Sequence, residues 1–481
     1  MSQTSIKNSV DFSSTKNSFL ILAAIVFCLG ISISYSLGFL PLQVIFPLLV
    51  LPFLIILFLT RQETLLLVIV ATYFIVGYFF SDFLIQGLVR GSILFLIGFM
   101  LILQTGVRKD ITRVSTSLDR IIFLWIIIIL ISFLYGFYFE ANKARYLFGD
   151  LYKFVEIISV FWLATLIIKN RRQVRFLIWG FFFIVLVLGA VDFVVFFIRT
   201  GVVGDILKAR VRAGVQFSSI FALILAGALI LHEKRIMVKL VLAFLSLAFL
   251  VSFILCFLRT GYVVIPSTFA VILFLYFYKN KNRALGGIKN IALLIFLLLL
   301  FIVSFNIILS SIDPRLNIIE ATFTRFFSMV DPYSGDSVGV RTQEAKSIVS
   351  YVLAGKPLLG SGLGGEYYTA GEIAGKIQWG MKHYVHNNYL DFLVRTGILG
   401  LFIFFVFAFK YLKDAITFYL RSRDDFYQGA LLGCIGIFIS SMMIAFSVSI
   451  FYCPFIFMVV GMTYCIAHFE EKNRLKVKKN E

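Results

Sequence analysis

Charged residues are scarce in this sequence, and their scarcity limits what kind of protein it can be. Only 14% of the 481 residues are Asp, Glu, Lys or Arg, whereas 60% are apolar. Soluble domains carry about 25% charged and about 45–50% apolar residues. The composition therefore excludes an ordinary soluble domain and favours one membrane-embedded domain over residues 1–481.

Cysteine is also rare, and none lies in the longest polar segment. Cys28, Cys256, Cys434, Cys453 and Cys465 all lie inside apolar runs. A buried cysteine behaves as a small hydrophobic residue, and these positions define no disulfide framework.

The apolar runs predict about 14 membrane spans, because each crossing takes roughly 20 apolar residues. They begin near Phe19, Leu42, Leu65, Ser92, Ile121, Leu151, Phe176, Ala213, Leu240, Tyr262, Ile291, Tyr389, Gln428 and Ile450. The first run has no cleavage pattern after it, so we interpret it as an uncleaved span. The predicted fold class is an all-α polytopic membrane protein.

The net charge of +19 is distributed as short basic clusters between alternate spans. These clusters lie around Arg61, Arg108–Arg120, Lys169–Arg175, Lys234–Lys239, Lys279–Lys289, Lys410–Arg423 and Lys472–Lys479. The positive-inside rule assigns this side to the cytoplasm, which makes both termini cytoplasmic. No continuous basic face with readers of bases is present, so nucleic acid is excluded as a partner.

The segment 313–388 is the longest polar stretch, and it is predicted to face outward. Apolar spacing predicts one short helix over Asn317–Val330 and another over Arg341–Leu353. Next comes Gly360-Ser361-Gly362-Leu363-Gly364-Gly365, which contains G-x-G-x-x-G. The dinucleotide motif needs a preceding strand and a following helix, so we predict a turn here, with its N–H groups available to an anion.

Two of the gaps between spans that are predicted to face outward carry cations that the positive-inside rule does not explain. The gap Arg199–Arg212 holds Arg199, Lys208, Arg210 and Arg212 against a single Asp205. Arg259 interrupts two apolar runs with almost no loop around it, at a cost that decreases near the interface. Arginine matches the geometry of phosphate, so these residues suggest an anion site. Contact with lipid headgroups is the alternative for all of them, and a surface charge is the alternative for Arg341.

His386 lies where the outward segment re-enters the membrane. Histidine titrates near neutrality, so beside an anion site it can take a proton from a hydroxyl. A metal bound by His383 and His386 is the rival interpretation, but no third or fourth ligand is evident. The outward gaps also contain no D-x-D, so phosphate chemistry here would depend on arginines.

These residues resemble the O-antigen ligase and O-antigen polymerase superfamily. The resemblance lies in HNNYLDFLVRTGILG, where His386 and Asn387 are followed by Gly397 and Gly400. Upstream, Arg341 and Pro357-Leu358-Leu359-Gly360-Ser361-Gly362 are similar to that family's approach to the histidine. Arg212 and Arg259 look like its two earlier arginines, with Arg210 competing for the first position.

The resemblance implies a GT-C type glycosyltransferase that is metal-independent, inverting and without cofactor. Its donor would be an undecaprenyl-pyrophosphate-linked oligosaccharide on the outer face of the bacterial cytoplasmic (inner) membrane. His386 would be the base, and Arg212 or Arg210, Arg341 and Arg259 would hold the pyrophosphate. The acceptor would be a lipid-linked repeat unit for a polymerase, which we favour, or lipid A core or another acceptor for a ligase.

A transporter or flippase for lipid-linked sugars is the alternative of a different class. Such proteins carry internal repeats and broken helices near mid-membrane. No repeat is visible in this sequence, and the long one-sided segment fits a transporter poorly.

Overall fold

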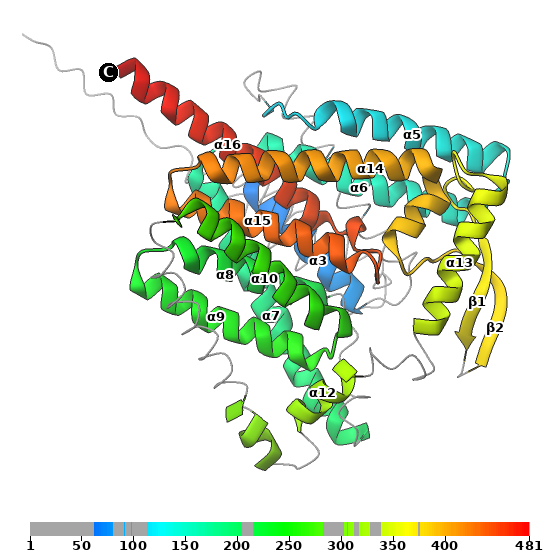
Figure 1. Ribbon diagram of the computed structural model, residues 1–481, viewed down its shortest axis with the longest axis horizontal. Helices are drawn as coiled ribbons and strands as arrows, with labels where there is room; N and C mark the ends of the chain where they lie inside the picture. Colours follow the sequence, from blue (N-terminus) through cyan, green and yellow to red (C-terminus); the bar gives the residue numbers. More distant parts are fainter. Residues whose placement is uncertain are drawn as a thin grey trace, which may run out of the picture.

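A computed structural model shows an elongated bundle of helices with a small β-hairpin at one end (Figure 1). It describes residues 62–79, 91, 98, 113–203, 215–281, 303–304, 306–311, 317–327, 338–373 and 376–480. The predicted spans from Phe19 and Leu42 lie outside the described residues, as do Arg210 and Arg212, and the runs from Ser92 and Ile291 are described only in part.

The helices follow the apolar runs of the sequence. In the bundle they are α3 (Gln62–Phe79), α5 (Asp119–Tyr138), α6 (Ala144–Ile167), α7 (Arg171–Val203), α8 (Val215–His232), α9 (Ile236–Leu255), α10 (Arg259–Lys279), α14 (Asn388–Arg421), α15 (Asp425–Ile444) and α16 (Pro454–Asn480). The outward segment adds α12 (Ile318–Phe327), α13 (Val338–Gly355), β1 (Tyr367–Ile373) and β2 (Lys376–Lys382), and a short 3₁₀ turn, η3 (Ile450–Tyr452), precedes α16.

Six described helices, α5, α7, α9, α10, α14 and α15, are long and apolar enough to cross a membrane. They match the runs predicted from Ile121, Phe176, Leu240, Tyr262, Tyr389 and Gln428. The chain is therefore a helical membrane protein, with these six spans identified among its described residues.

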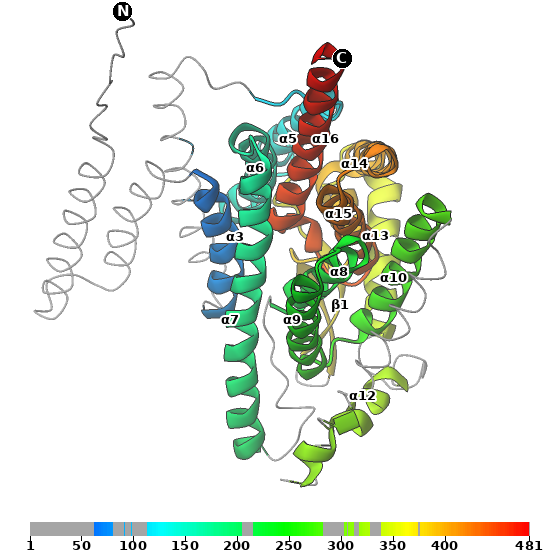
Figure 2. The ribbon, with the colours of Figure 1, turned by 90° about the vertical axis from the view of Figure 1, so that its left-hand side faces the viewer.

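The helices pack in pairs that are often distant in sequence. α5 contacts α14, α6 contacts α16, and α8 contacts α15, while α7, α9 and α8 lie side by side (Figure 2). Trp125 on α5 lies at the centre, fully buried, with the rings of Phe154, Phe392 and Phe407 5.8–5.9 Å away. Aromatic packing therefore joins α5, α6 and α14.

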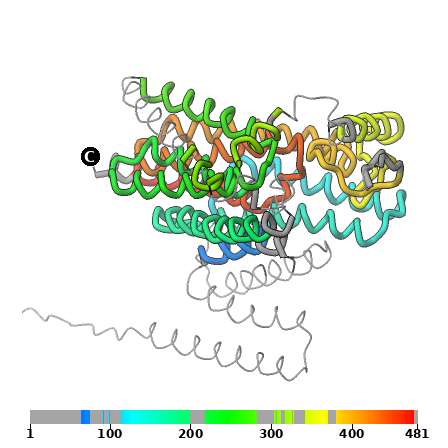
Figure 3. Tube along the Cα trace, turned by 90° about the horizontal axis from the view of Figure 1, so that it is seen from below, coloured from blue at the N-terminus to red at the C-terminus, as the bar shows by residue number. Residues whose placement is uncertain are grey.

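α13 and the hairpin of segment 313–388 cover one end of the bundle. α13 packs on β1 and on α14, and both lengthwise views place α13 and the hairpin at the end opposite the C-terminus (Figures 1 and 3). The sequence predicted α12 and α13 but not the hairpin. Its strands pair antiparallel from Tyr367 with Lys382 to Ile373 with Lys376, and α13 covers β1, so this pairing depends on tertiary contact.

Candidate functional site

His386 lies between the end of β2 and the start of α14, and its ring contacts a buried carboxylate. The Nδ1 of His386 lies 3.2 Å from Oε2 and 3.3 Å from Oε1 of Glu344 on α13. The side chain of His386 is 44% exposed, whereas that of Glu344 is 4% exposed. Since an ionised carboxylate only accepts hydrogen bonds, the proton of a neutral His386 belongs on Nδ1. Among the described residues none hydrogen-bonds Nε2, which leaves that nitrogen as an acceptor.

Glu344 is held ionised by its neighbours. The hydroxyl of Tyr367 donates to its Oε1 at 2.7 Å, alongside His386. Burial raises the pKa of the Glu344 carboxyl, but the hydrogen bonds from His386 and Tyr367 outweigh it and leave that pKa below its ordinary value. The pair therefore has the arrangement of a base and its orienting carboxylate.

Arg341 lies one helical turn before Glu344 on α13, so the two side chains project from the same side of that helix. Arg341 is exposed, and its charge acts on the hydroxyl of Tyr384. The Tyr384 ring in turn meets the His386 ring edge-on, with centroids 5.1 Å apart. A guanidinium and a carboxylate on α13 and an imidazole just before α14 thus belong to one region of the structure.

Arg259 begins α10 and is half-buried. The preceding turn is strained, because Phe257 is buried with a φ of 46°, and such strain is typical of functional segments. The next residue, Thr260, is hydrogen-bonded to Ser447 through their hydroxyls at 2.9 Å. This contact attaches the start of α10 to the segment 445–449.

The segment 445–449 also contacts the residues on both sides of His386. The hydroxyl of Ser449 donates to the Val385 carbonyl at 2.8 Å, and the side chain of Asn387 donates to the Phe446 carbonyl at 3.1 Å. Asn387 also caps α14 by accepting from the N–H of Tyr389 at 2.9 Å. Arg259 and His386 are therefore arranged around one common segment.

Gly397 and Gly360 bring two backbones into direct contact. Gly397 interrupts α14 with a φ of 64°, and a Cβ there would lie 2.1 Å from the Leu358 carbonyl oxygen. Gly360, also at 64°, would place a Cβ 2.3 Å from the carbonyl oxygen of Val394. The N–H of Ser361 donates to that same carbonyl at 2.8 Å. Only glycine fits both the dihedral angles and the space at these positions.

Gly362 and Gly400 allow other close approaches. A Cβ on Gly362 would lie 2.7 Å from the Cα of Gly136 on α5. One on Gly400 would meet the side chain of Thr396. Gly360, Gly362 and Gly397 therefore let the turn pack closely against α14 and α5, whereas the contact of Gly400 lies within α14.

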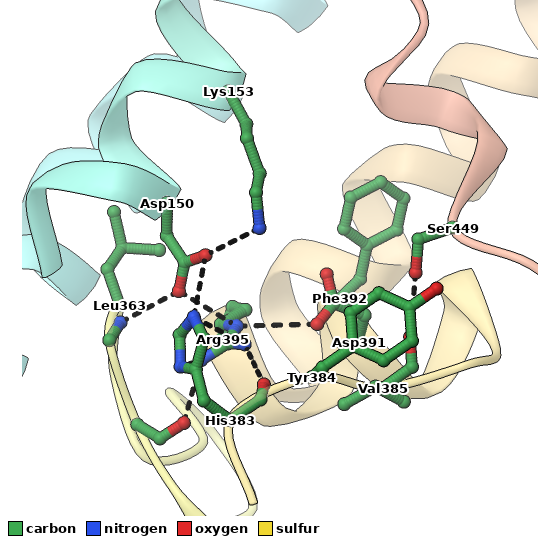
Figure 4. A network of polar contacts seen from close by, with 12 residues as sticks. Asp150, Lys153, Leu363, His383, Tyr384, Val385, Asp391, Phe392, Arg395 and Ser449 are labelled. Carbon is green, nitrogen blue, oxygen red and sulfur yellow. Dashed lines mark hydrogen bonds and ion pairs between the residues drawn. The ribbon is translucent and has the colours of Figure 1, made fainter. Parts of the chain in front are cut away.

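A second polar centre lies beside His386, built around Arg395 (Figure 4). Arg395 is 1% exposed, and its Nε lies 3.0 Å from Asp150 on α6 and 3.3 Å from Asp391 on α14. One terminal nitrogen donates to the Gly365 carbonyl at 2.7 Å and to the Nδ1 of His383 at 2.9 Å. A buried charge is stable only when its partners surround it, and Arg395 meets this condition.

His383 belongs to this polar centre and contacts Arg395, Asp150 and Tyr146. Because Arg395 can only donate, the Nδ1 of His383 accepts from one of its terminal nitrogens at 2.9 Å. The Nε2 of His383 lies 3.3 Å from the other terminal nitrogen of Arg395 and 3.4 Å from Asp150. The ring also stacks on Tyr146 with centroids 4.2 Å apart. Both nitrogens are engaged, which disfavours the metal-binding alternative for His383 and His386. No group of three or more metal-ligating side chains occurs within the described part of the chain.

Asp150 connects the centre to the glycine turn. It accepts from the N–H of Gly364 at 2.9 Å and from Lys153 at 3.0 Å. The anion that this N–H binds is therefore a carboxylate of the protein itself, whereas the sequence suggested an external one.

Three polar residues of the region were not singled out from the sequence: Glu344, Asp150 and Arg395. Glu344 had a usable signal, since it follows Arg341 by one helical turn. Arg395 had another, as a charge inside an apolar run. Asp150 had none, because only the fold brings α6 to α14.

Residues 244–405 match the model of a protein family described as O-antigen ligase. This segment is similar to that family. It contains Arg259, Arg341 and His386, and it confirms the resemblance of the chain to the O-antigen ligase and polymerase superfamily. No curated protein matches the chain. The family supports a function of the O-antigen ligase or polymerase type, with a lipid-linked glycan and an acceptor as substrates in general.

Proposed function

We propose that this protein is a metal-independent, inverting glycosyltransferase that extends a polysaccharide on the outer face of the bacterial cytoplasmic membrane. The donor is a glycan on undecaprenyl pyrophosphate, and the acceptor is a second lipid-linked repeat unit. The observation that supports this proposal best is the half-exposed His386 with its Nδ1 on Glu344 and its Nε2 open.

In the proposed reaction, the Nε2 of His386 removes the proton from an acceptor hydroxyl while Glu344 stabilises the resulting imidazolium. The acceptor oxygen bonds to the anomeric carbon as the bond from that carbon to the pyrophosphate oxygen breaks. Attack from the opposite face inverts the anomeric centre. The leaving undecaprenyl pyrophosphate carries its negative charge away from the sugar.

Arginines are proposed to stabilise that leaving charge. Arg341 is proposed to act from α13 and Arg259 from the start of α10, and Arg212 or Arg210 completes the set by family resemblance. Fixed cations aimed at developing charge are a large source of rate enhancement. A set of arginines can neutralise a pyrophosphate without a divalent ion.

The experiment that tests the proposal is a reaction of purified protein with a defined undecaprenyl-pyrophosphate glycan. We expect polymer and released undecaprenyl pyrophosphate from the wild type, and neither from His386→Ala, Arg341→Ala or Arg259→Ala. Lys346→Ala changes an exposed cation on the same helix as Arg341 and serves as the matched control. Normal product ladders from all three variants would refute the site, and inhibition by EDTA that Mg²⁺ reverses would refute the metal-free mechanism.

A ligase is the second candidate, because the matching family model is described as O-antigen ligase. The same reaction mixture distinguishes the two. A ligase leaves the lipid-linked glycan unextended until lipid A core or another final acceptor is added, whereas a polymerase extends it alone.

A further inference from the structure

A cavity of about 420 Å³ lies at the end of the bundle opposite His386. Its walls come from the segment before α5, from the last part of α14 and from α16, and include Ser117, Lys410, Asp414, Arg421 and Arg474. α14 runs from the residue after Asn387 to Arg421, so its whole length separates the cavity from the candidate active site (Figure 1).

Two of the carboxylates at the cavity already have partners within the protein. Asp414 accepts from Lys410 at 2.7 Å, from Tyr464 at 2.8 Å and from Ser117. Glu470 accepts from the hydroxyl of Ser422 at 2.7 Å and from the backbone N–H groups that follow it. The charge of Asp414 is paired with Lys410, and one oxygen of Glu470 is taken up by the turn that follows α14.

The arginines at the cavity lack such partners. Arg421 lies in the last turn of α14, and its carbonyl accepts from the guanidinium of Arg474 on α16. Among the described residues neither arginine forms an ion pair with a carboxylate. His468 lies on the same wall, and the exposed Glu471 is the remaining acid. Two arginines that line one hollow are suited to an oxyanion that accepts several hydrogen bonds, such as a phosphate group.

The surroundings favour an anion that belongs to a lipid. The helices that form the cavity expose large apolar side chains outside it, including Phe123 on α5 and Phe409 on α14, 62% and 68% exposed. Such faces contact acyl chains, and basic residues at the ends of spans attract lipid phosphates. The volume lies within the range of small-molecule sites.

We propose that this cavity binds a phosphate group, with Arg421 and Arg474 as its ligands, and that the phosphate belongs to the headgroup of a membrane lipid. Bound lipid would link α14 to α16 at the end remote from His386. The proposal does not depend on the glycosyltransferase reaction. Inorganic phosphate has the same chemistry, so the experiment separates the two sources.

The test uses the full-length protein in a lipid-free, phosphate-free detergent, with the thermal unfolding midpoint as the readout. Phosphatidylglycerol is titrated in one arm and inorganic phosphate in the other. A ligand that binds only the folded protein raises the midpoint. We expect phosphatidylglycerol to raise it saturably, and Arg421→Gln with Arg474→Gln to increase the half-saturating concentration about tenfold or more, as expected for loss of a charge-assisted hydrogen bond.

The control pair is Lys413→Gln with Lys472→Gln, which removes two exposed cations from the same two helices outside the cavity. It should titrate like the wild type. Arg421→Gln alone serves as a second variant, because its exposed side chain is not needed for packing. A response to inorganic phosphate alone would support the site with a soluble ligand. No saturable response to either, or equal loss in the control pair, would overturn the proposal.

Discussion

His383 and His386 are three residues apart, yet they differ in exposure and in how far other side chains engage their ring nitrogens. The side chain of His383 is 14% exposed, with both ring nitrogens engaged by Arg395 and Asp150. The side chain of His386 is 44% exposed, with one nitrogen on Glu344 and the other open. A histidine whose two nitrogens are fixed can position a chain, whereas one with an open, oriented nitrogen can move a proton.

The difference arises from what each histidine faces. His383 faces α6 and α14, which meet through the buried charges of Asp150 and Arg395. His386 faces α13, which covers only one side of it. The same short segment therefore has one end held by buried charges, at His383, and one more exposed end, at His386.

The largest expected effect separates the two histidines directly. His386→Ala should reduce glycan transfer by about 10²- to 10⁴-fold, the contribution of a general base, while lowering the thermal unfolding midpoint only by the loss of its contact to Glu344. His383→Ala should lower the unfolding midpoint, and its activity should fall only with the loss of folded protein. Initial rates normalised to folded protein, measured beside unfolding curves in the same detergent, give both quantities. Equal normalised rates for the two variants would remove the distinction.

Breaking the buried ion pair of Asp150 with Arg395 should have the next largest effect. Asp150→Asn leaves Arg395 without one of its two carboxylates, and removing one partner of a buried ion pair costs about 3–5 kcal/mol. The measurement is the free energy of unfolding of the purified variant, with Lys143→Gln as the control. Lys143 pairs with Glu366 at 2.9 Å, but its side chain is 65% exposed, so its loss should cost little. An Asp150→Asn variant as stable as the wild type would show that the ion pair of Asp150 with Arg395 does not stabilise the fold.

Six of the spans could be predicted from the sequence, and the surroundings of His386 could not. Apolar runs of sufficient length predicted α5, α7, α9, α10, α14 and α15, because the bilayer sets a length that composition reveals. The glycines at 360 and 397 were recognised as a pattern, but the contact that requires them joins two distant backbones. Asp150 meets Arg395 across more than two hundred residues of chain, and no local periodicity records that pairing.

A smaller effect is expected from removing the charge that orients His386. Glu344→Gln retains the shape of the side chain but no longer stabilises an imidazolium. We expect activity to fall about 10- to 100-fold, as for other carboxylates that orient a histidine, with Glu344→Asp recovering part of it. The pH profile of kcat/KM tests the assignment, because a purely structural role would lower the rate without shifting the profile. An unshifted profile would contradict the role of Glu344 as a positioning residue.

The smallest expected effect is the change of stability with pH, which compares the carboxylates of Glu344 and Asp150. The pKa of Glu344 lies below its ordinary value, so the folded protein binds that proton less readily than the unfolded chain. Its stabilisation is therefore complete above the ordinary pKa and is lost as the pH falls through the lowered one. Burial raises the pKa of the Asp150 carboxyl, but Arg395 and Lys153 outweigh it and hold that pKa well below its usual range.

On acidification from about pH 6 to about pH 3, the Glu344 contact should therefore be lost before the Asp150 contact. The unfolding midpoint of the wild type should fall more steeply over this range than that of Glu344→Gln, which has no proton to gain there. The two curves should converge at the acid end of the range, since both proteins then carry an uncharged group at position 344. Parallel curves would show that Glu344 is not ionised in the folded protein, and His386 would then lack the charge that distinguishes it from His383.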